Sequence, residues 1–403
     1  MKLLSLFFAG LLVTYGCAKL WLVPSNAVPD SDWCRHWFCE TDLETQHEYQ
    51  EYLQARVQQV AETVPGFAEI LRRDPASSYR WCDLAEAMVE SGQLETARYC
   101  MGTAIALAPH SAAILLRAAN FFFRINDIPR AMHFSQAILS QIPDFDAIIF
   151  SNFDRFGIPV DSILHDGLPA TPRAARSYFS HLLSSDRVAD TELVWSWMTA
   201  HGYADDPIAG AYEAFLLRNK AYDEAAKSWV VYLGNRRGDL YRTNRVFNGD
   251  FENPPIGSPL DWQIGQVEGA LITRDSGSVH SGRYSLHIRF AGTYNVALNQ
   301  VSQAAIVLPG TYRLEYFIKT DALTTNEGVR LRVFDPANAA LLDVLTDPVL
   351  GTNDWRLEVS NFVVKPQTHM VQVQVVRNVS QKFDNKIGGS AWVDGVKIEP
   401  VSP

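Results

Sequence analysis

The stretch SYRWCDLAEAMVESGQLETARYCMGTAIALAPHS, residues 78–111, is followed by AAILLRAANFFFRINDIPRAMHFSQAILSQIPDF, residues 112–145, and the two match at a period of 34 residues. The first unit has apolar residues at helical spacing, a glycine that tolerates a turn, small residues that let a second helix approach, and a proline that stops it. These positions hold Trp81, Leu84, Ala85, Met88, Gly92, Ala97, Met101, Ala104 and Pro109. One hairpin cannot bury its outer face alone, so the repeat predicts stacked helical hairpins.

The helical pattern extends beyond the two full units. A degraded unit follows at residues 209–234, residues 151–199 are helical in pattern without matching a unit, and residues 43–61 have the composition of a polar helix. We therefore expect an α-solenoid over residues 42–240. The histidines of this half are scattered without the spacing that a metal-binding helix needs, and no catalytic constellation is visible.

Both full units resemble the tetratricopeptide repeat, although Ala85 and Ala119 stand where that family usually has glycine. In that family the first helix of each repeat lines a concave groove that binds peptide or protein, so the resemblance implies a protein partner. The implied groove residues are Tyr79, Cys82, Glu86 and Val89 in the first unit, and Ala113, Leu116, Asn120 and Phe123 in the second. The alternative is that this surface only packs against flanking helices.

From residue 241 onward the sequence changes to short runs with a period of two, such as Tyr312–Ile318 and Met370–Val376. Glycine, proline, asparagine and aspartate punctuate the gaps between the runs, as between the strands of an antiparallel sandwich. We therefore expect a multidomain α + β chain with a β-sandwich over residues 241–403. The net charge of −10, with no basic cluster, argues against a nucleic-acid-binding protein.

Six fragments of the C-terminal half occur in the order of a known series, namely Asn248–Glu252, Trp262, His280–Ser285, Pro309–Leu314, Trp355 and Ala391–Val396. In this order they resemble carbohydrate-binding modules of the galactose-binding-like jelly roll, the group of families 4, 9 and 22. The resemblance implies a structural calcium ion held by Glu252 and Asp394, with backbone oxygens from Asp250 and the loop at 281–283. Oxygen ligands from loops suit Ca²⁺. The alternative is that both carboxylates cap strands or turns.

A sugar site needs aromatic faces for stacking and planar polar side chains for the hydroxyl groups. The candidates are Tyr294, Trp262, Trp355, Arg289 and Gln300, together with Tyr316 and Asn299. Trp262 and Trp355 match positions that are often core in the family, whereas Tyr294 lies in a loop-like stretch. No pair of acidic residues stands in a context that marks a glycosidase.

The N-terminus predicts export. Met1 and Lys2 precede an apolar run at residues 3–13, so residues 1–27 have the composition of a signal peptide or a membrane anchor, and Cys17 offers lipidation as a third fate. Residues 28–41 form a linker with Cys34 and Cys39, close enough for a small disulfide loop, whereas Cys82 and Cys100 have the pattern of unpaired packing residues.

We therefore expect a non-catalytic, exported protein of the periplasm or cell surface. Its solenoid would bind a protein, and its sandwich would bind a polysaccharide, with no nucleic acid and with the membrane reached only through the N-terminal segment. This domain combination resembles accessory proteins of exopolysaccharide or envelope biogenesis. The alternatives are a purely structural protein whose sandwich has no sugar ligand and, least favoured, a glycan-active enzyme.

Overall fold

The computed structural model describes residues 63–185 and 187–401, and the chain divides into two compact units at Pro169 and Ala170. The signal segment, the linker with Cys34 and Cys39, and the polar helix expected at 43–61 lie outside the described residues. Among the described residues, no helix combines the length and the apolar character needed to cross a membrane.

The first unit is built from helical hairpins. Its helices are α4 (Thr63–Arg73), α5 (Ser78–Glu90), α6 (Leu94–Leu107), α7 (Ala112–Arg124), α8 (Ile128–Gln141), α9 (Asp146–Arg155) and the single turn α10 (Val160–Ser162), with short turns at Pro143–Phe145 and Ile163–Gly167. The turn after α5 contains Gly92 at φ +78° and the equivalent turn after α7 contains Asn126 at φ +58°, the left-handed conformation that these two residue types adopt most readily. The predicted helical half is thus confirmed as helical.

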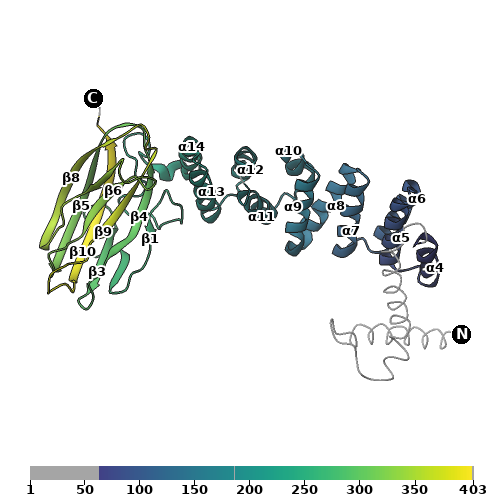
Figure 1. Ribbon diagram of the computed structural model, residues 1–403, viewed down its shortest axis with the longest axis horizontal. Coiled ribbons are helices and arrows are strands. Elements are labelled where there is room, and N and C mark those ends of the chain that lie inside the picture. Colours follow the sequence, from purple (N-terminus) through teal and green to yellow (C-terminus); the bar gives the residue numbers. More distant parts are fainter. Residues whose placement is uncertain (1–62, 186, 402–403) are drawn as a thin grey trace, which may run out of the picture. The chain divides into compact units, whose positions relative to one another are not determined.

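The second unit begins with four more helices, α11 (Pro172–Leu183), α12 (Val188–Ala200), α13 (Asp206–Arg218) and α14 (Tyr222–Leu233), followed by a short turn at Gly234–Arg237. The last two of these helices lie next to the sandwich (Figure 1). Trp229 of α14 packs edge to face on Phe247, with ring centres 5.6 Å apart. Gly210 of α13 lies so close to Gly257 that a Cβ atom at position 210 would be 3.0 Å from the Gly257 carbonyl oxygen. The boundary expected at residue 241 therefore falls inside a compact unit.

The β-sandwich contains two antiparallel sheets of five strands each, ordered β1-β4-β9-β6-β7 and β2-β3-β10-β5-β8. The strands are β1 (Gln263–Ile264), β2 (Ala270–Asp275), β3 (Ser285–Ala291), β4 (Leu298–Ile306), β5 (Gly310–Leu323), β6 (Arg330–Phe334), β7 (Asp343–Leu345), β8 (Gly351–Val364), β9 (Met370–Arg377) and β10 (Gly388–Pro400). The alternation that predicted the strands sorts their side chains. In β9, for example, Val371, Val373 and Val375 enter the core while Gln372 and Gln374 face outward.

Candidate functional site

A polar groove lies on the outer face of the β1-β4-β9-β6-β7 sheet. It encloses about 670 Å³ and combines outward residues of β4, β6, β7 and β9 with the loop after β9. Its lining residues are Ala297, Leu298, Asn299, Arg332, Asp343, Leu345, Gln374, Val376, Arg377, Asn378, Val379 and Gln381. We call this set the polar groove. Planar amides and two guanidinium groups dominate it, and such groups bind hydroxyls and carbonyls through hydrogen bonds with fixed directions.

The polar side chains of this groove are held in place before any ligand arrives. Arg332 donates two parallel hydrogen bonds of 2.7 Å to the Asp343 carboxylate, and its guanidinium lies 4.3 Å from the centre of the Phe334 ring. These hydrogen bonds lower the pKa of Asp343 below its ordinary value, so its carboxylate stays ionised at neutral pH. Gln374 donates a 2.7 Å hydrogen bond to the Asn299 carbonyl, which bridges β9 and β4.

One of the two guanidinium groups that line the groove is buried. Arg377 is 1% exposed and donates to the Glu327 carbonyl at 2.9 Å, to Thr325 Oγ1 at 3.0 Å and to the Val296 carbonyl. Burial lowers the pKa of Arg377. Because these acceptors belong to the loops before β4 and before β6, one side chain sets the position of two loops beside the groove.

The structure places none of the five aromatic and polar residues named first as sugar ligands in this groove. Trp262 is core, since its indole N–H donates to the Asn248 carbonyl at 2.9 Å and its ring stacks on Phe251. The expectation that Trp262 contacts a sugar is therefore wrong. Tyr316 is also buried, with its hydroxyl 2.8 Å from Thr346 Oγ1.

The remaining predicted sugar residues are dispersed. Trp355 and Arg289 belong to the other sheet, on β8 and β3. Tyr294 is 44% exposed in the loop between β3 and β4, where its hydrogen bond to Glu268 raises its pKa. Gln300 lies on β4, but its side chain accepts a hydrogen bond from the Asn299 backbone N–H at 2.9 Å. Asn299 alone of the wider set lines the polar groove.

The residues that sequence reasoning missed carry a simple signal. Gln374 is a polar member of an alternating run, so it was assignable to an outer face. Arg332 opposes Gln374 across the β6–β9 pair and Leu345 across the β6–β7 pair, a neighbourhood that local sequence does not reveal.

Glu252 and Asp394, the carboxylates expected to bind calcium, accept hydrogen bonds from backbone N–H groups. One oxygen of Glu252 accepts hydrogen bonds from the backbone of Arg283 at 2.6 Å and Tyr284 at 2.9 Å. Asp394 accepts three more from the backbone N–H groups of residues 280, 281 and 395, at 2.7 to 3.1 Å, and Asp250 is exposed. Among the described residues no cluster of three His, Cys, Asp or Glu side chains could hold a metal ion. These contacts agree with the capping alternative, and calcium binding at Glu252 and Asp394 stays a prediction.

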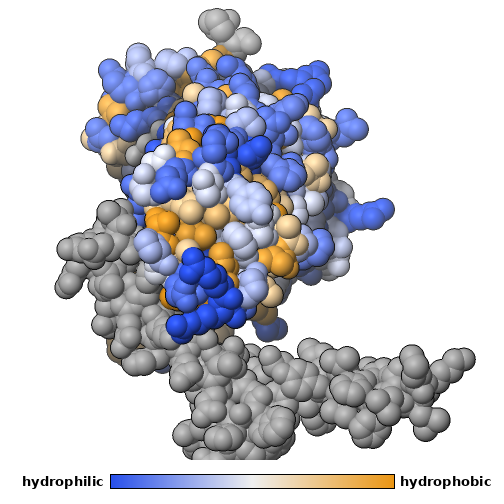
Figure 2. Space-filling model, turned by 90° about the vertical axis from the view of Figure 1, so that its right-hand side faces the viewer, coloured by the Kyte–Doolittle hydropathy of each residue, from blue (hydrophilic) through white to orange (hydrophobic). Residues whose placement is uncertain are grey.

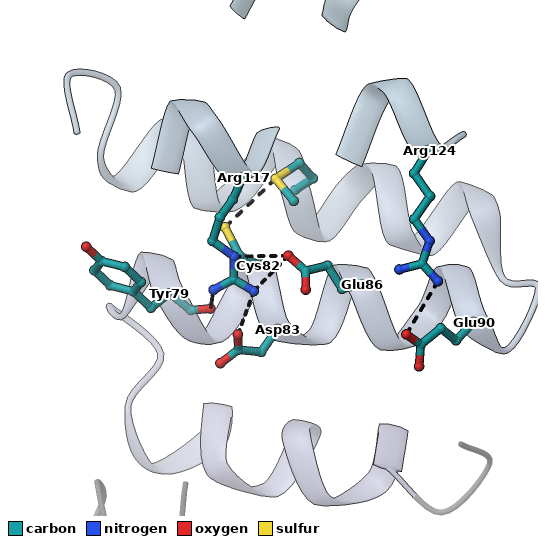
Figure 3. A network of polar contacts seen from close by, with 8 residues as sticks. Tyr79, Cys82, Asp83, Glu86, Glu90, Arg117 and Arg124 are labelled. Carbon is teal, nitrogen blue, oxygen red and sulfur yellow. Dashed lines mark hydrogen bonds and ion pairs between the residues drawn. The ribbon is translucent and has the colours of Figure 1, made fainter. Parts of the chain in front are cut away.

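The face of α5 and α7 expected to bind protein is largely occupied by contacts between the two helices. Figure 3 shows Arg117 of α7 reaching across to α5, where its guanidinium donates to Asp83 at 2.6 Å and to Glu86 at 2.9 and 3.0 Å. Arg117 also donates to the Tyr79 carbonyl at 3.3 Å. This network was not anticipated from the sequence.

Other residues of that face are also engaged. Phe123 is buried and stacks on Phe156 with ring centres 4.8 Å apart, so its assignment to an open groove is wrong. Asn120 accepts a 2.7 Å hydrogen bond from Asn152 of α9, Val89 is half-buried, and Cys82 is a free thiol in the core.

An open apolar surface lies on the second helices instead. A hollow of about 720 Å³ between α6 and α8 is lined by Glu95, Arg98, Tyr99, Gly102, Ile105, Phe122, Pro129, Arg130, His133 and Phe134, and we call it the helical hollow. Tyr99 is 68% exposed at its rim. Apolar side chains also gather on the end face that carries α4–α6, ringed by hydrophilic ones (Figure 2).

Comparison with known proteins finds similarity in structure. No protein-family model matches the chain, and no curated protein is similar to it in sequence. The enzymatically active domain of tailspike protein 4 from bacteriophage CBA120 aligns at 16% identity and a TM-score of 0.30, over 40% of this chain and 22% of that one. TmCBM61, solved with β-1,4-galactotriose, aligns at 17% sequence identity and a TM-score of 0.27, over 39% of this chain and 99% of that one. The CBM22-1 xylan-binding domain from Paenibacillus barcinonensis aligns at 11% sequence identity and a TM-score of 0.27, over 35% of this chain and 86% of that one.

Proposed function

We propose that the chain is a non-catalytic binding protein whose sandwich holds a polysaccharide segment in the polar groove. The observation that carries the proposal is the fixed array of planar polar groups there. Arg332, Asp343 and Gln374 are each held by a hydrogen bond of 2.7 Å, so little side-chain entropy is lost when a sugar replaces water. With no aromatic residue among the lining residues, recognition depends on hydrogen bonds rather than on ring stacking.

The same groove favours binding over hydrolysis. Glycosidases generally use two carboxylates beside the scissile bond, one of them as a general acid with a raised pKa. Asp343 is the one carboxylate among the residues that line the polar groove, and its pKa is lowered by Arg332. A carboxylate in that state is a poor proton donor at neutral pH.

The test is glycan binding by the full chain and by two variants of β9. We would apply the protein to a glycan array, with β-1,4-galactan and xylan as the first soluble probes, and measure affinities by calorimetry. Gln374→Leu removes a groove amide of similar size, and we expect about tenfold weaker binding from the loss of one net hydrogen bond. Gln372→Leu is the matched control, because Gln372 faces outward on the same strand but does not line the groove.

A well-folded chain that binds no glycan would refute this function. One observation favours the alternative of a structural, protein-binding sandwich, namely that Trp262 is buried and that Tyr294 and Trp355 lie away from the polar groove. Equal affinities of the Gln374→Leu variant and the wild type would show that the sugar binds elsewhere on the sandwich.

We further propose that the helical hairpins are tetratricopeptide-like and bind a protein partner at the helical hollow. Hairpins α5–α6 and α7–α8 repeat the same lengths, 13 and 14 residues, in both units, which supports the repeat assignment. A photoreactive phenylalanine analogue at Tyr99 should crosslink a partner in envelope extracts, whereas the same analogue at Tyr79, on the face first expected, should not. A crosslink at Tyr79 and none at Tyr99 would show that the partner binds the face of α5 and α7.

Export belongs to the same proposal and is supported by the charged start and the apolar run at residues 3–13. Fractionation of cells that express the tagged full chain tests it, and recovery of the protein in the cytoplasmic fraction would contradict it.

A further inference from the structure

The middle of the polar groove holds two polar side chains that lean apart. Arg332 of β6 lies directly opposite Gln374 of β9, and such pairs have Cβ atoms about 5 Å apart. The Arg332 guanidinium is bonded to Asp343 on β7, whereas the Gln374 amide is bonded to the Asn299 carbonyl on β4. Because β7 and β4 flank the β6–β9 pair on opposite sides, the two side chains leave a gap between them on the face of the sheet.

Each of these side chains keeps hydrogen-bonding capacity for a ligand in the gap. Arg332 uses Nε and Nη2 on Asp343, so its Nη1 group remains as a donor. Gln374 uses Nε2 on Asn299, and no described residue donates a hydrogen bond to its Oε1. The gap therefore has a donor on its β6 side and an acceptor on its β9 side. A trans amide fits such a pair, because its C=O and N–H groups point in opposite directions.

Charged ligands and ligands with hydroxyl groups alone fit the groove less well. Arg332 is paired with Asp343, and Arg377 is 1% exposed and donates to two backbone carbonyls and a hydroxyl. A uronic acid or a sulfated sugar therefore meets no unpaired positive charge on the lining side chains. These side chains also include no aromatic ring on which the face of a plain pyranose could stack. The ligand that they favour is uncharged and carries a planar group with both a donor and an acceptor.

Aliphatic side chains extend the groove on the β9 side of the gap. Val376 follows Gln374 on the same face of β9, and Val379 in the loop after β9 is 40% exposed. Both line the groove, as do Ala297 and Leu298 where β4 begins. In a trans acetamide the methyl group lies on the same side as the N–H. An acetamide whose N–H donates to Gln374 therefore turns its methyl group toward β9 as well, where these side chains can cover it.

We propose that the polar groove is selective for polysaccharides that carry 2-acetamido groups, of which β-1,4-linked N-acetylglucosamine is the simplest example. The acetamido carbonyl accepts a hydrogen bond from Arg332, its N–H donates to Gln374, and its methyl group packs against Val376 and Val379. This selectivity rests on the proposed function of the groove and narrows its ligand class. A groove of about 670 Å³ has room for sugar rings as well as the substituent.

Two tetrasaccharides that differ only at C2 of each ring test the selectivity. The β-1,4-linked tetramer of N-acetylglucosamine has an acetamido group where cellotetraose has a hydroxyl. In calorimetry with the full chain, we expect the acetylated tetramer to bind about tenfold more tightly, because it adds a net hydrogen bond and a buried methyl group. In saturation-transfer difference NMR, its acetyl methyl protons should receive the strongest saturation.

A matched pair of valine variants tests the methyl contact. Val379→Thr keeps the size and the branching of the side chain but replaces a methyl group with a hydroxyl. Binding of the acetylated tetramer should weaken about fourfold, and binding of cellotetraose should not change. Val359→Thr is the control, because Val359 is 49% exposed on β8 of the other sheet and does not line the groove. Circular dichroism confirms that both variants are folded.

The outcomes separate the acetamido selectivity from sugar binding itself. If cellotetraose binds as tightly as the acetylated tetramer and Gln374→Leu weakens both, the groove binds sugar without this selectivity and the proposal is wrong. Equal effects of Val379→Thr and Val359→Thr on the acetylated tetramer would also overturn it, as would binding of another glycan but of neither tetramer. A folded chain that binds no glycan at all removes both the selectivity and the proposed function.

Discussion

Glu213 of α13 gives the sharpest prediction about stability. Its side chain is fully buried, and Ser228 donates a 2.6 Å hydrogen bond to Oε1. None of the described residues donates a hydrogen bond to Oε2. Burial raises the pKa of Glu213 from 4.5 to about 8, so the carboxyl group is protonated in the folded protein at neutral pH.

The sign of the pH dependence follows from that direction. Above pH 4.5 the unfolded chain releases this proton while the folded chain keeps it, so the free energy of unfolding falls as the pH rises. Each pH unit in this window is worth about 1.36 kcal/mol, and the window from 4.5 to about 8 therefore removes about 5 kcal/mol. Full stability from this group exists below the unfolded pKa and is lost as the pH passes through the folded one.

The Glu213→Gln variant isolates the effect. Glutamine keeps an acceptor for Ser228 and cannot ionise, so we expect the variant to match the wild type near pH 4.5 and to exceed it by about 4 to 5 kcal/mol near pH 8. Urea unfolding at several pH values, followed by circular dichroism, measures both proteins, and their difference cancels the other titrating groups. Glu192→Gln on α12 is the control, because Glu192 is exposed. A difference that stays constant with pH for Glu213→Gln would refute the reasoning.

Three further predictions concern the other sites. Arg117→Met leaves the buried Asp83 carboxylate without its partner on α7, so we expect a loss of about 3 kcal/mol in urea unfolding, against less than about 1 kcal/mol for the exposed Arg72→Met. Excess EDTA should leave the melting midpoint unchanged if the N–H groups alone hold Asp394 in place, and a fall in the midpoint would support the calcium prediction. Asp343→Asn should weaken glycan binding at neutral pH. Wild-type binding, measured by calorimetric titration, should decline only below pH 3.8, the ordinary carboxyl pKa. A decline at higher pH would show that the Arg332–Asp343 pair is not intact.

The fold was predictable where periodicity is strong. A 34-residue repeat specifies helical hairpins through local spacing alone, and the run Met370–Val376 specifies a strand with one buried face. Neither prediction needs knowledge of what packs against the segment.

The site was less predictable because it depends on which strands become neighbours. Asn299, Arg332 and Gln374 are far apart in sequence and meet only through the β4-β9-β6 order. A preference for aromatic ligands misdirected the prediction to Trp262, whose indole N–H finds a backbone acceptor and allows the ring to be buried. On the helices, Arg117 occupies a face that repeat positions alone mark as open.

The contacts of α13 and α14 with the segment that leads into the sandwich limit how this chain can be recombined. A binding module that is exchanged between proteins as a cassette needs a seam that few side chains cross. Here Gln303 of β4 exchanges two hydrogen bonds with the backbone of Phe247, and that ring packs on Trp229. A cut at residue 241 would separate Phe247 from Trp229 of α14. The segment that could be transferred between proteins as one unit therefore begins at Ala170 and includes all four helices.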